Sequence, residues 1–321
     1  MQNKEQTLSQ LFEFLSIPSI STDPKYLSAC REGAQWVEAF LKNAGADNVQ
    51  LFETPGNPVV YSDKIIDPKL PTILVYGHYD VQPADPESEW TTPAFSPEIR
   101  DNKVFARGAS DDKGQVFVHL KALEQMIKSD ELCCNVKMVI EGEEEAYKGH
   151  LEIFCEENRE LLKADVCLIS DTAMFSYDDP TIDVGLRGIT YFQLHLKGSK
   201  RDLHSGVYGG AIVNPLNVLN QFLGSIQSSD GRVQIPGFYD DLIMVSLDES
   251  AQIAKIPFDI EAFGNDVGEM DFLGDKRVSF LEKTGFWPSF DVHGIVGGYM
   301  EEGVKTVIPS TAEAKFSFRL A

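Results

Sequence analysis

The chain has 321 residues, of which 43% are apolar and 24% are charged, the balance of an ordinary globular protein. Its 50 acidic and 28 basic side chains give a net charge of −22, which argues against binding to nucleic acids or acidic membrane surfaces, because both need a basic patch. No apolar run of about 18 residues occurs, so no membrane span is predicted. The five cysteines have no C-x-x-C spacing, which indicates a reducing compartment, and we expect a cytoplasmic protein.

The first half of the chain is predicted to alternate helices and strands. An N-terminal helix with Leu8, Leu11, Phe12 and Leu15 on one face should end before Pro18. Helices are then expected over residues 30–44, 113–127 and 150–162, and strands over 48–53, 58–62, 71–76, 103–107, 135–142 and 165–170. This alternation is typical of an α/β layered domain, which we place at residues 1–186.

Beyond residue 186 the pattern changes to that of an antiparallel structure. Two segments alternate apolar and polar side chains as half-exposed strands do. We expect these strands at 188–200 and 307–320, a helix at 214–226, a loop at 228–242 and a turn around His293. Residues 187–321 are therefore predicted to form a separate α+β domain.

Side chains that commonly bind metals follow several of the predicted strands. His78 and Asp80 come after strand 71–76, and Asp111 lies in the GASDDKG turn that leads into a helix. Two more positions are the pair Glu144 and Glu145, after strand 135–142, and Asp171, after strand 165–170. Ligands of open α/β sheets bind beyond the carboxyl ends of the strands, so we expect these side chains to gather at one edge.

One imidazole and several carboxylates form a ligand set that suits zinc or manganese, whereas calcium favours oxygen ligands alone. Two such ions ~3.5–4 Å apart polarise a carbonyl group and lower the pKa of a shared water. Of the adjacent Glu144 and Glu145, one would bind metal while the other acts as general base. Asp80 is placed to accept the second N–H group of the His78 imidazole.

Each of these residues also has an ordinary structural explanation. A histidine at the end of a strand and an acidic run such as EGEEE at 141–145 occur without any site. Aspartates are also common at helix N-caps and in turns. We favour a site because residues of these types occur together at the ends of separate strands.

Six ordered motifs resemble those of the M20 family of metallopeptidases: GHYDVQPA, RGASDDKG, EGEEE, SDT, GLRG and DLHSGVYGG. The similarity extends from His78 to Arg319 and is greatest to the branch of cytosolic non-specific and carnosine dipeptidases. It implies a zinc-peptidase-like catalytic domain, with a mixed sheet flanked by helices, and an inserted α+β lid or dimerisation domain. It also implies hydrolysis of dipeptides or short peptides by two divalent ions, and a homodimer formed through the lid domain.

The resemblance implies a role for each motif residue. His78 and Asp171 would bind the first ion, Glu145 the second, and Asp111 would bridge the two from a turn whose bond to Asp112 is cis. Glu144 would be the general base, and Asp80 would orient His78. His204 would stabilise the oxyanion in a partner's active site. Contacts to the substrate would come from His204, Asn214, Thr306 and Arg319. Arg319 would bind the substrate carboxylate through a bidentate pair.

The sequence departs from the family pattern in two places. Residues 146–150 replace the usual short run after the paired glutamates, which leaves open which glutamate is the base. The chain also ends at Ala321, before the last histidine ligand and the Gly-rich loop that the family supplies. We therefore expect both domains to be incomplete, the second metal site to be weak, and activity to be low. The alternatives are a deacylase of N-acyl amino acids and a catalytically impaired, metal-binding homologue.

Overall fold

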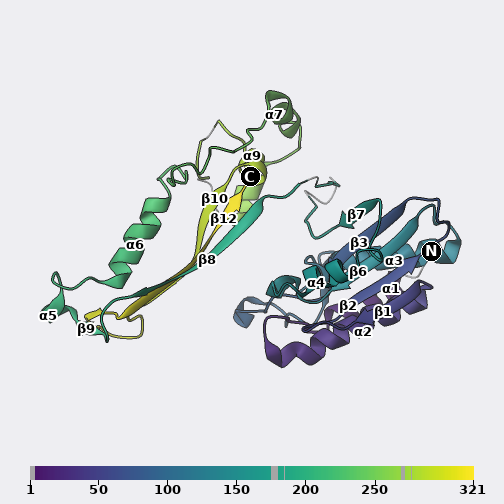
Figure 1. The fold of residues 1–321 in the computed structure, drawn as a ribbon, viewed down its shortest axis with the longest axis horizontal. Coiled ribbons are helices and arrows are strands. Elements are labelled where there is room, and N and C mark those ends of the chain that lie inside the picture. The colour runs from purple at the N-terminus through teal and green to yellow at the C-terminus, as the bar shows by residue number, and fades with distance from the viewer. Residues whose placement is uncertain (1–3, 175–179, 184, 269–271, 276) are drawn as a thin grey trace. The chain divides into compact units, whose positions relative to one another are not determined.

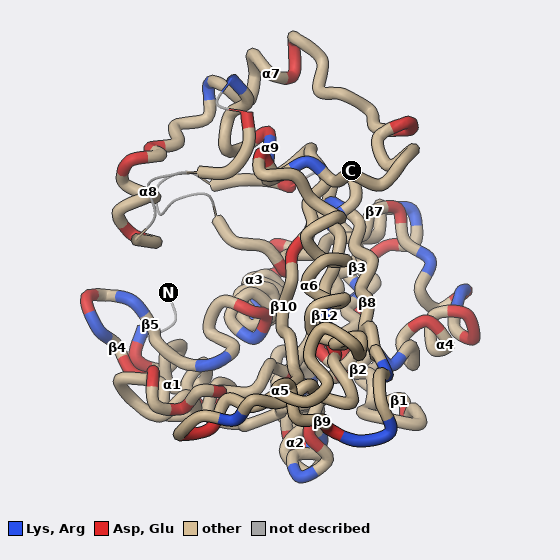
Figure 2. The backbone as a smooth tube through the Cα atoms, turned by 90° about the vertical axis from the view of Figure 1, so that its left-hand side faces the viewer, with Lys and Arg blue, Asp and Glu red and all other residues tan. Residues whose placement is uncertain are grey.

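The computed structural model describes residues 4–174, 180–183, 185–268, 272–275 and 277–321. The chain divides into two compact units, Met1–Thr181 and Ile182–Ala321 (Figure 1). Each unit has its own sheet and its own hydrophobic core. Basic and acidic residues are interspersed over the elements of both units (Figure 2). No helix within the described ranges is long and apolar enough to cross a membrane.

A five-stranded sheet forms the centre of unit 1 (Figure 1). Its strands are β1 (Asp47–Phe52), β2 (Val59–Lys64), β3 (Thr72–His78), β6 (Asn135–Glu141) and β7 (Val166–Ile169), in the spatial order β1-β2-β6-β3-β7. β3 is parallel to both β6 and β7, whereas β2 is antiparallel to β1 and β6. The sheet is therefore mixed, as the resemblance implied, and the carboxyl ends of β3, β6 and β7 lie at the same edge.

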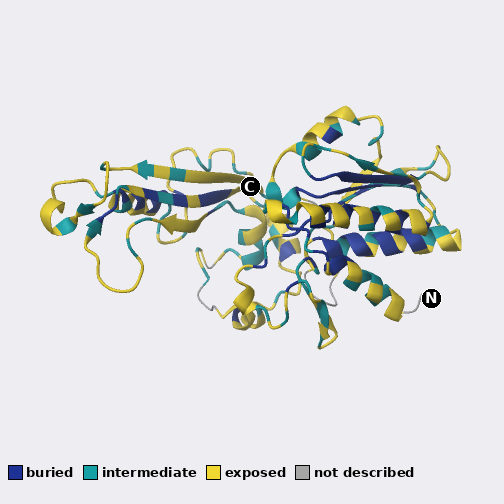
Figure 3. Cartoon of the chain, turned by 90° about the horizontal axis from the view of Figure 1, so that it is seen from below, coloured by how far each residue is buried: buried dark blue, intermediate teal, exposed yellow. Residues whose placement is uncertain are grey.

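Three helices pack on one face of this sheet. They are α1 (Lys4–Leu15), α2 (Leu27–Ala44) and α3 (Lys113–Ser129). Strand side chains alternate between faces, so Val60, Met138 and Ile140 point into the core that these helices complete. The intervening residues Val59 and Val139 belong instead to a second core on the opposite face. Figure 3 shows the buried residues of unit 1 concentrated in the sheet and in the helices against it.

The opposite face of the sheet is covered by α4 (His150–Glu157), whose Phe154 packs against β2 and β6. This helix ends before the predicted residue 162, because the Asn158 side chain bonds to the Phe154 carbonyl (2.8 Å) and caps it. The short elements of unit 1 are η1 (Pro24–Tyr26), η2 (Glu87–Glu89), β4 (Glu98–Arg100), β5 (Lys103–Phe105) and η3 (Glu144–Ala146).

Unit 2 is built on a long antiparallel sheet in the order β10-β12-β8. Its strands are β8 (Gly188–Lys197), β10 (Ser289–Val296) and β12 (Thr311–Leu320), and α6 (Pro215–Ile226) packs on one face. Leu219 and Leu223 of α6 meet Phe316 and Phe318 of β12 in this core, which appears as the buried stripe of unit 2 in Figure 3. Beyond one end of the sheet, β9 (Leu203–His204) pairs with β11 (Val307–Ile308) and leads into α5 (Ser205–Tyr208).

Two expectations for unit 2 were wrong or incomplete. His293 lies on β10 rather than in a turn, because its Gly-rich surroundings form a bulge between Val292 and Gly294 without ending the strand. Three further helices, α7 (Leu247–Ile253), α8 (Ile260–Val267) and α9 (Phe280–Phe286), were not predicted. The first and last begin with Ser-x-x-Glu capping boxes, at Ser246 and Ser279, a signal that sequence reading could have used.

Candidate metal centre

The candidate site lies where the parallel strands of unit 1 end. His78 is the last residue of β3, and Asp171 comes two residues after β7. Asp111 precedes α3, and its peptide bond to Asp112 is cis, as the resemblance implied. Glu144 and Glu145 lie in η3, just beyond β6. The expectation that strand ends deliver these residues to one edge follows from the parallel pairing of β3 with its two neighbours.

Three side chains converge closely enough to share one ion. His78 Nε2 lies 3.3 Å from Asp111 Oδ1 and 3.5 Å from Asp171 Oδ2, and one ligand atom from each residue falls within 4.8 Å of the others. His78 is fully buried, and its Nε2 has no hydrogen-bond partner among the described residues. A buried ring nitrogen without a partner, facing two carboxylates, is the arrangement that a divalent cation satisfies. The residues present therefore fit a divalent metal.

Electrostatics at His78 support the same conclusion. Burial alone would lower the His78 pKa, but the interactions with Asp111, Asp171 and Asp80 outweigh burial and raise it. The imidazole in turn lowers the pKa of Asp111, against the effect of that residue's own burial. The cluster thus stabilises one positive charge at Nε2, which a proton or a metal ion can provide.

Asp80 lies on the other side of the His78 ring. The His78 Nδ1 atom is 3.0 Å from the Asp80 carbonyl oxygen and 3.3 Å from its Oδ1. The second carboxylate oxygen, Oδ2, accepts the Ser21 hydroxyl at 2.5 Å and the Glu145 N–H at 3.1 Å. This geometry leaves Nε2 to face the carboxylates of Asp111 and Asp171, which is what the predicted orienting role of Asp80 requires.

Glu144 and Glu145 are near enough to interact electrostatically with His78, but neither belongs to the group of converging ligand atoms formed by His78, Asp111 and Asp171. Burial raises the pKa of both carboxyl groups, and nearby carboxylates add to the effect. Glu145 is fixed by Gln82, whose Nε2 donates to Glu145 Oε2 at 2.6 Å. A raised pKa makes a carboxylate a stronger proton acceptor, which is the property that a general base needs.

Several supporting residues were not predicted from the sequence. The buried Asp112 accepts the His78 N–H at 3.1 Å, and a Cβ atom at Gly77 would lie 2.7 Å from the same carboxylate oxygen. Lys113 is fully buried, and its Nζ donates to the carbonyl oxygens of Phe14 (3.1 Å) and Ile17 (2.6 Å). Asp112 and Lys113 directly follow Asp111 in the DDKG motif, and this position in the sequence is the signal that could have identified them as supporting residues.

His150 has a second structural role besides starting a helix at the surface, which its position in the sequence suggests. It begins α4, as expected. Its Nδ1 also bonds to the buried Glu143 carboxylate at 2.6 Å, and Lys148 contacts the same group at 3.2 Å. The turn that follows the paired glutamates is therefore closed by side chains of its own residues.

The predicted residues of unit 2 fall into two places. His204 and Thr306 lie together, since Val307 pairs with His204 and the Ser205 N–H donates to the Thr306 carbonyl at 3.0 Å. Arg319 is at the far end of β12, about 27 Å from Thr311 at ~3.4 Å per residue. Figure 1 shows β9 and the C-terminus at opposite ends of the sheet. The structure thus separates these residues within unit 2.

Asn214 has a clear structural role. Its Oδ1 accepts the Leu216 N–H at 3.0 Å and caps α6, with Pro215 at the first helical position. This capping explains the Asn-Pro pair without any substrate contact.

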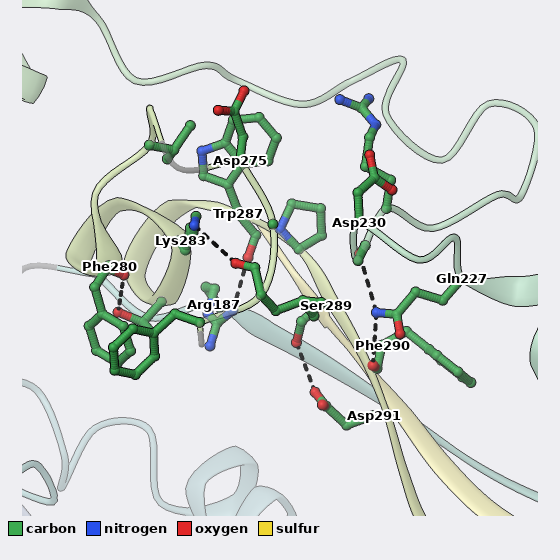
Figure 4. Close-up of a pocket in the computed structure, with 18 of the residues that line it drawn as sticks. Arg187, Gln227, Asp230, Asp275, Phe280, Lys283, Trp287, Ser289, Phe290 and Asp291 are labelled. Carbon is green, nitrogen blue, oxygen red and sulfur yellow. Dashed lines mark hydrogen bonds between the residues drawn. The ribbon is translucent and has the colours of Figure 1, made fainter. Parts of the chain in front are cut away.

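A cavity of about 540 Å³ lies at the end of unit 2 that carries Arg187 and Ser289 (Figure 4). Its wall includes the aromatic rings of Trp287 and Phe290. The Arg187 guanidinium donates to the Trp287 carbonyl oxygen at 2.9 Å, and burial lowers its pKa. Elsewhere in the wall, Arg277 pairs with Asp275 at 2.6 Å. The residues that line the cavity include none of the predicted metal ligands.

Comparison with known proteins identifies the family. The profile of peptidase family M20/M25/M40 matches residues 74–312. The chain belongs to this family. That match begins inside β3 and ends inside β12, so it covers all four predicted metal ligands.

Three M20 proteins illustrate the similarity. The β-Ala-His dipeptidase of Rattus norvegicus is 35% identical over 87% of the chain and 60% of its own length. The Cys-Gly metallodipeptidase DUG1 of Candida albicans is 32% identical over 98% of the chain and 69% of its own length. The crystal structure of the M20 family metallo-carboxypeptidase Sso-CP2 from Sulfolobus solfataricus has a TM-score of 0.89 at 35% identity, over 98% of this chain and 71% of that one. The chain thus spans about three fifths of the length of the rat dipeptidase.

Proposed function

We propose that this protein hydrolyses the peptide bond of dipeptides or short peptides with the help of divalent metal ions. The convergence of His78, Asp111 and Asp171 around a buried nitrogen without a described partner supports this most directly. The names of two M20 relatives, a β-Ala-His dipeptidase and a Cys-Gly metallodipeptidase, support a dipeptide substrate. The alternatives are a deacylase of N-acyl amino acids and a catalytically impaired homologue, and an assay with three substrates separates them.

Zinc or manganese is the proposed metal, because a mixed set of imidazole and carboxylate ligands suits either ion. His78 and Asp171 would hold one ion, Asp111 would be shared, and Glu145 would hold a second. When bound, such ions polarise the scissile carbonyl and lower the pKa of a water molecule between them.

The protein's own groups would supply proton transfer and orientation. Glu144 would take the proton of the attacking water and deliver it to the leaving amine, a task that fits its raised pKa. Asp80 would hold the His78 ring by its Nδ1 side so that Nε2 faces the ligands. Burial of His78 and Asp80 keeps water from competing for these contacts.

Unit 2 would contribute the substrate contacts and a dimer interface. Arg319 would bind the C-terminal carboxylate of the substrate, and Thr306 and His204 would contact its carbonyl region, His204 by stabilising the oxyanion. An extended dipeptide spans only ~7 Å, far less than the separation of His204 from Arg319 along β12. Both residues can act on one substrate if His204 comes from a second copy, which supports a homodimer. Asn214 is the weakest candidate contact, given its capping role.

The proposal is tested by assaying the purified chain with β-alanyl-histidine, cysteinyl-glycine and an N-acetyl amino acid, after dialysis against a chelator and addition of zinc or manganese. We expect metal-dependent release of free amino acids from the dipeptides, and none from the Glu144→Gln variant. Cleavage of the acyl substrate alone would favour the deacylase. Tight metal binding without turnover of any substrate would favour the impaired homologue. A cytoplasmic location is proposed on the cysteine pattern, and fractionation of cells would check it.

A further inference from the structure

Asp80 is contacted by a segment that is about 60 residues away in the sequence. Residues 19–21, between α1 and η1, lie alongside residues 79–81, with a parallel bridge between Ile20 and Val81. The Val81 N–H donates to the Ser19 carbonyl oxygen at 3.0 Å. This short ladder lets two serine hydroxyls reach the strand end that carries His78.

The two serines are matched in burial but differ in what they touch. Ser19 and Ser21 are 0% and 2% exposed. The Ser19 hydroxyl donates to the main-chain carbonyl of Tyr79 at 2.6 Å. The Ser21 hydroxyl donates instead to the side chain of Asp80, at Oδ2 and 2.5 Å. Of the two, Ser21 therefore acts on the carboxylate that faces the imidazole.

We propose that Ser21 is a positioning residue for the metal centre, which sets the rotation of the Asp80 carboxylate. With Ser21 and the Glu145 N–H both bonded to Oδ2, the carboxylate holds Oδ1 at 3.3 Å from His78 Nδ1, beside the hydrogen bond that Nδ1 makes with the Asp80 carbonyl oxygen. Asp80 then joins the imidazole ligand of one ion to the main chain of Glu145, the proposed ligand of the second. Ser21 thus influences both sides of the cluster without touching a ligand atom.

Burial makes this hydrogen bond consequential. Asp80 is 0% exposed, so water cannot replace a donor that is removed from Oδ2. Without the Ser21 hydroxyl, the Glu145 N–H is the donor left to fix that oxygen, and the carboxylate can rotate away from Nδ1. Removing a group that orients a metal ligand typically weakens metal binding or activity by about 10- to 100-fold, and for a residue one contact further out we expect about 10-fold.

The test compares Ser21→Ala with Ser19→Ala and Ser21→Thr, using the whole chain. Cobalt(II) binding is measured by titration of its visible absorption, and thermal unfolding is measured without metal. We expect Ser21→Ala to bind cobalt about 10-fold more weakly, Ser21→Thr to restore binding, and Ser19→Ala to bind like the wild type. Both alanine variants should unfold at lower temperatures than the wild type, Ser21→Ala at the lower of the two, since its lost bond is to a carboxylate and that of Ser19→Ala is to a neutral carbonyl.

The inference fails if Ser21→Ala binds cobalt like the wild type, or if Ser19→Ala weakens binding as much. It rests on the proposed metal-dependent function, so a second readout uses the metal-free protein. The Nδ1–H proton of His78, assigned by its loss in His78→Gln, should be visible by NMR in the wild type and Ser19→Ala but shifted or lost in Ser21→Ala. A wild type that binds no cobalt would refute the proposed function, while this proton signal would still decide the role of Ser21.

Discussion

Glu144 and Glu145 are neighbours in one turn, but Glu145 alone of the two forms side-chain and main-chain hydrogen bonds with the described residues around His78. The Glu145 carboxylate accepts Gln82 Nε2 at 2.6 Å, and its N–H donates to Asp80 Oδ2 at 3.1 Å. The Glu144 carboxylate has no hydrogen bond to any residue that the structure describes. A fixed carboxylate suits a metal ligand, whereas one that is free to move suits a group that accepts and releases a proton.

Substitution of each glutamate should therefore distinguish the role of Glu144 from that of Glu145. Glu144→Gln is expected to lower kcat by about 100- to 10,000-fold while metal content stays unchanged, because it removes only proton transfer. Glu145→Gln should lower metal affinity as well, because it removes a ligand. Metal content is measured on the purified variants, and kcat with the dipeptide that the wild type cleaves best. Loss of metal from Glu144→Gln, with retention by Glu145→Gln, would exchange the two roles.

Lys113 connects the turn of Asp111 to the end of α1 and should matter for stability. Its fully buried Nζ, whose pKa burial lowers to about 7, donates to two main-chain carbonyls and lies 5.0 Å from the centre of the Phe14 ring. Lys113→Met keeps the length of the side chain but leaves both carbonyls without a donor, so we expect a loss of about 3 kcal/mol. Lys128→Met on the same helix removes a half-exposed lysine from the buried Glu124, which keeps its pair with Lys121, and should cost about 1 kcal/mol or less. Urea unfolding of both variants gives the comparison, and equal losses would refute this account.

Glu141 should make the stability of the metal-free chain depend on pH. Burial raises its pKa to about 7, although the Tyr76 hydroxyl, 2.7 Å from Oε1, acts in the opposite direction. The folded chain therefore binds this proton more tightly than the unfolded chain, in which the carboxyl keeps its ordinary pKa of 4.5. The contribution of Glu141 to the free energy of unfolding is fully present below pH 4.5 and is lost as the pH rises through 7. This contribution amounts to about 3 kcal/mol at most.

Glu141→Gln removes this titration and keeps an acceptor for Tyr76. We expect the free energy of unfolding, measured in urea with a chelator present, to fall less between about pH 5 and pH 8 in the variant than in the wild type. Tyr76→Phe removes the opposing bond and should enlarge the fall. An identical pH dependence in the wild type and Glu141→Gln would exclude Glu141 as its source.

The sequence was sufficient to predict that His78, Asp111 and Asp171 converge, because His78 and Asp171 follow strands whose apolar runs are easy to recognise and Asp111 lies in a Gly-marked turn before a helix. The parallel order of β3, β6 and β7 then brings them together. It was insufficient for Ser21, whose partner is 59 residues away and depends on a bridge that no local pattern reveals. His293 was misread because a bulged strand and a turn share glycine, and only pairing with β12 separates them.

The proposed homodimer, in which His204 of one copy acts at the active site of the other, leads to a prediction that can be tested by mixing variants. His204 and Arg319 are at opposite ends of the long sheet, so a dipeptide bound by Arg319, as proposed, would need the second copy's histidine. Each of His204→Ala and Glu144→Gln should then be inactive alone. When equal amounts are mixed and allowed to exchange subunits, about half of the dimers are hybrids, and each hybrid has one site with both Glu144 and His204.

About a quarter of the wild-type activity should therefore return on mixing, because one site in two is intact in half of the dimers. The measurement is dipeptide turnover after reversible dissociation of the mixed variants, with each variant treated alone as a control. Mixing His204→Ala with Arg319→Ala should restore activity in the same way, since Arg319 and His204 would again be supplied by different chains to one intact site. If no mixture regains activity although differently tagged copies of the two variants co-purify as hybrid dimers, His204 acts within its own subunit or not at all. If it acts within its own subunit, the separation of His204 from Arg319 would require a substrate longer than a dipeptide.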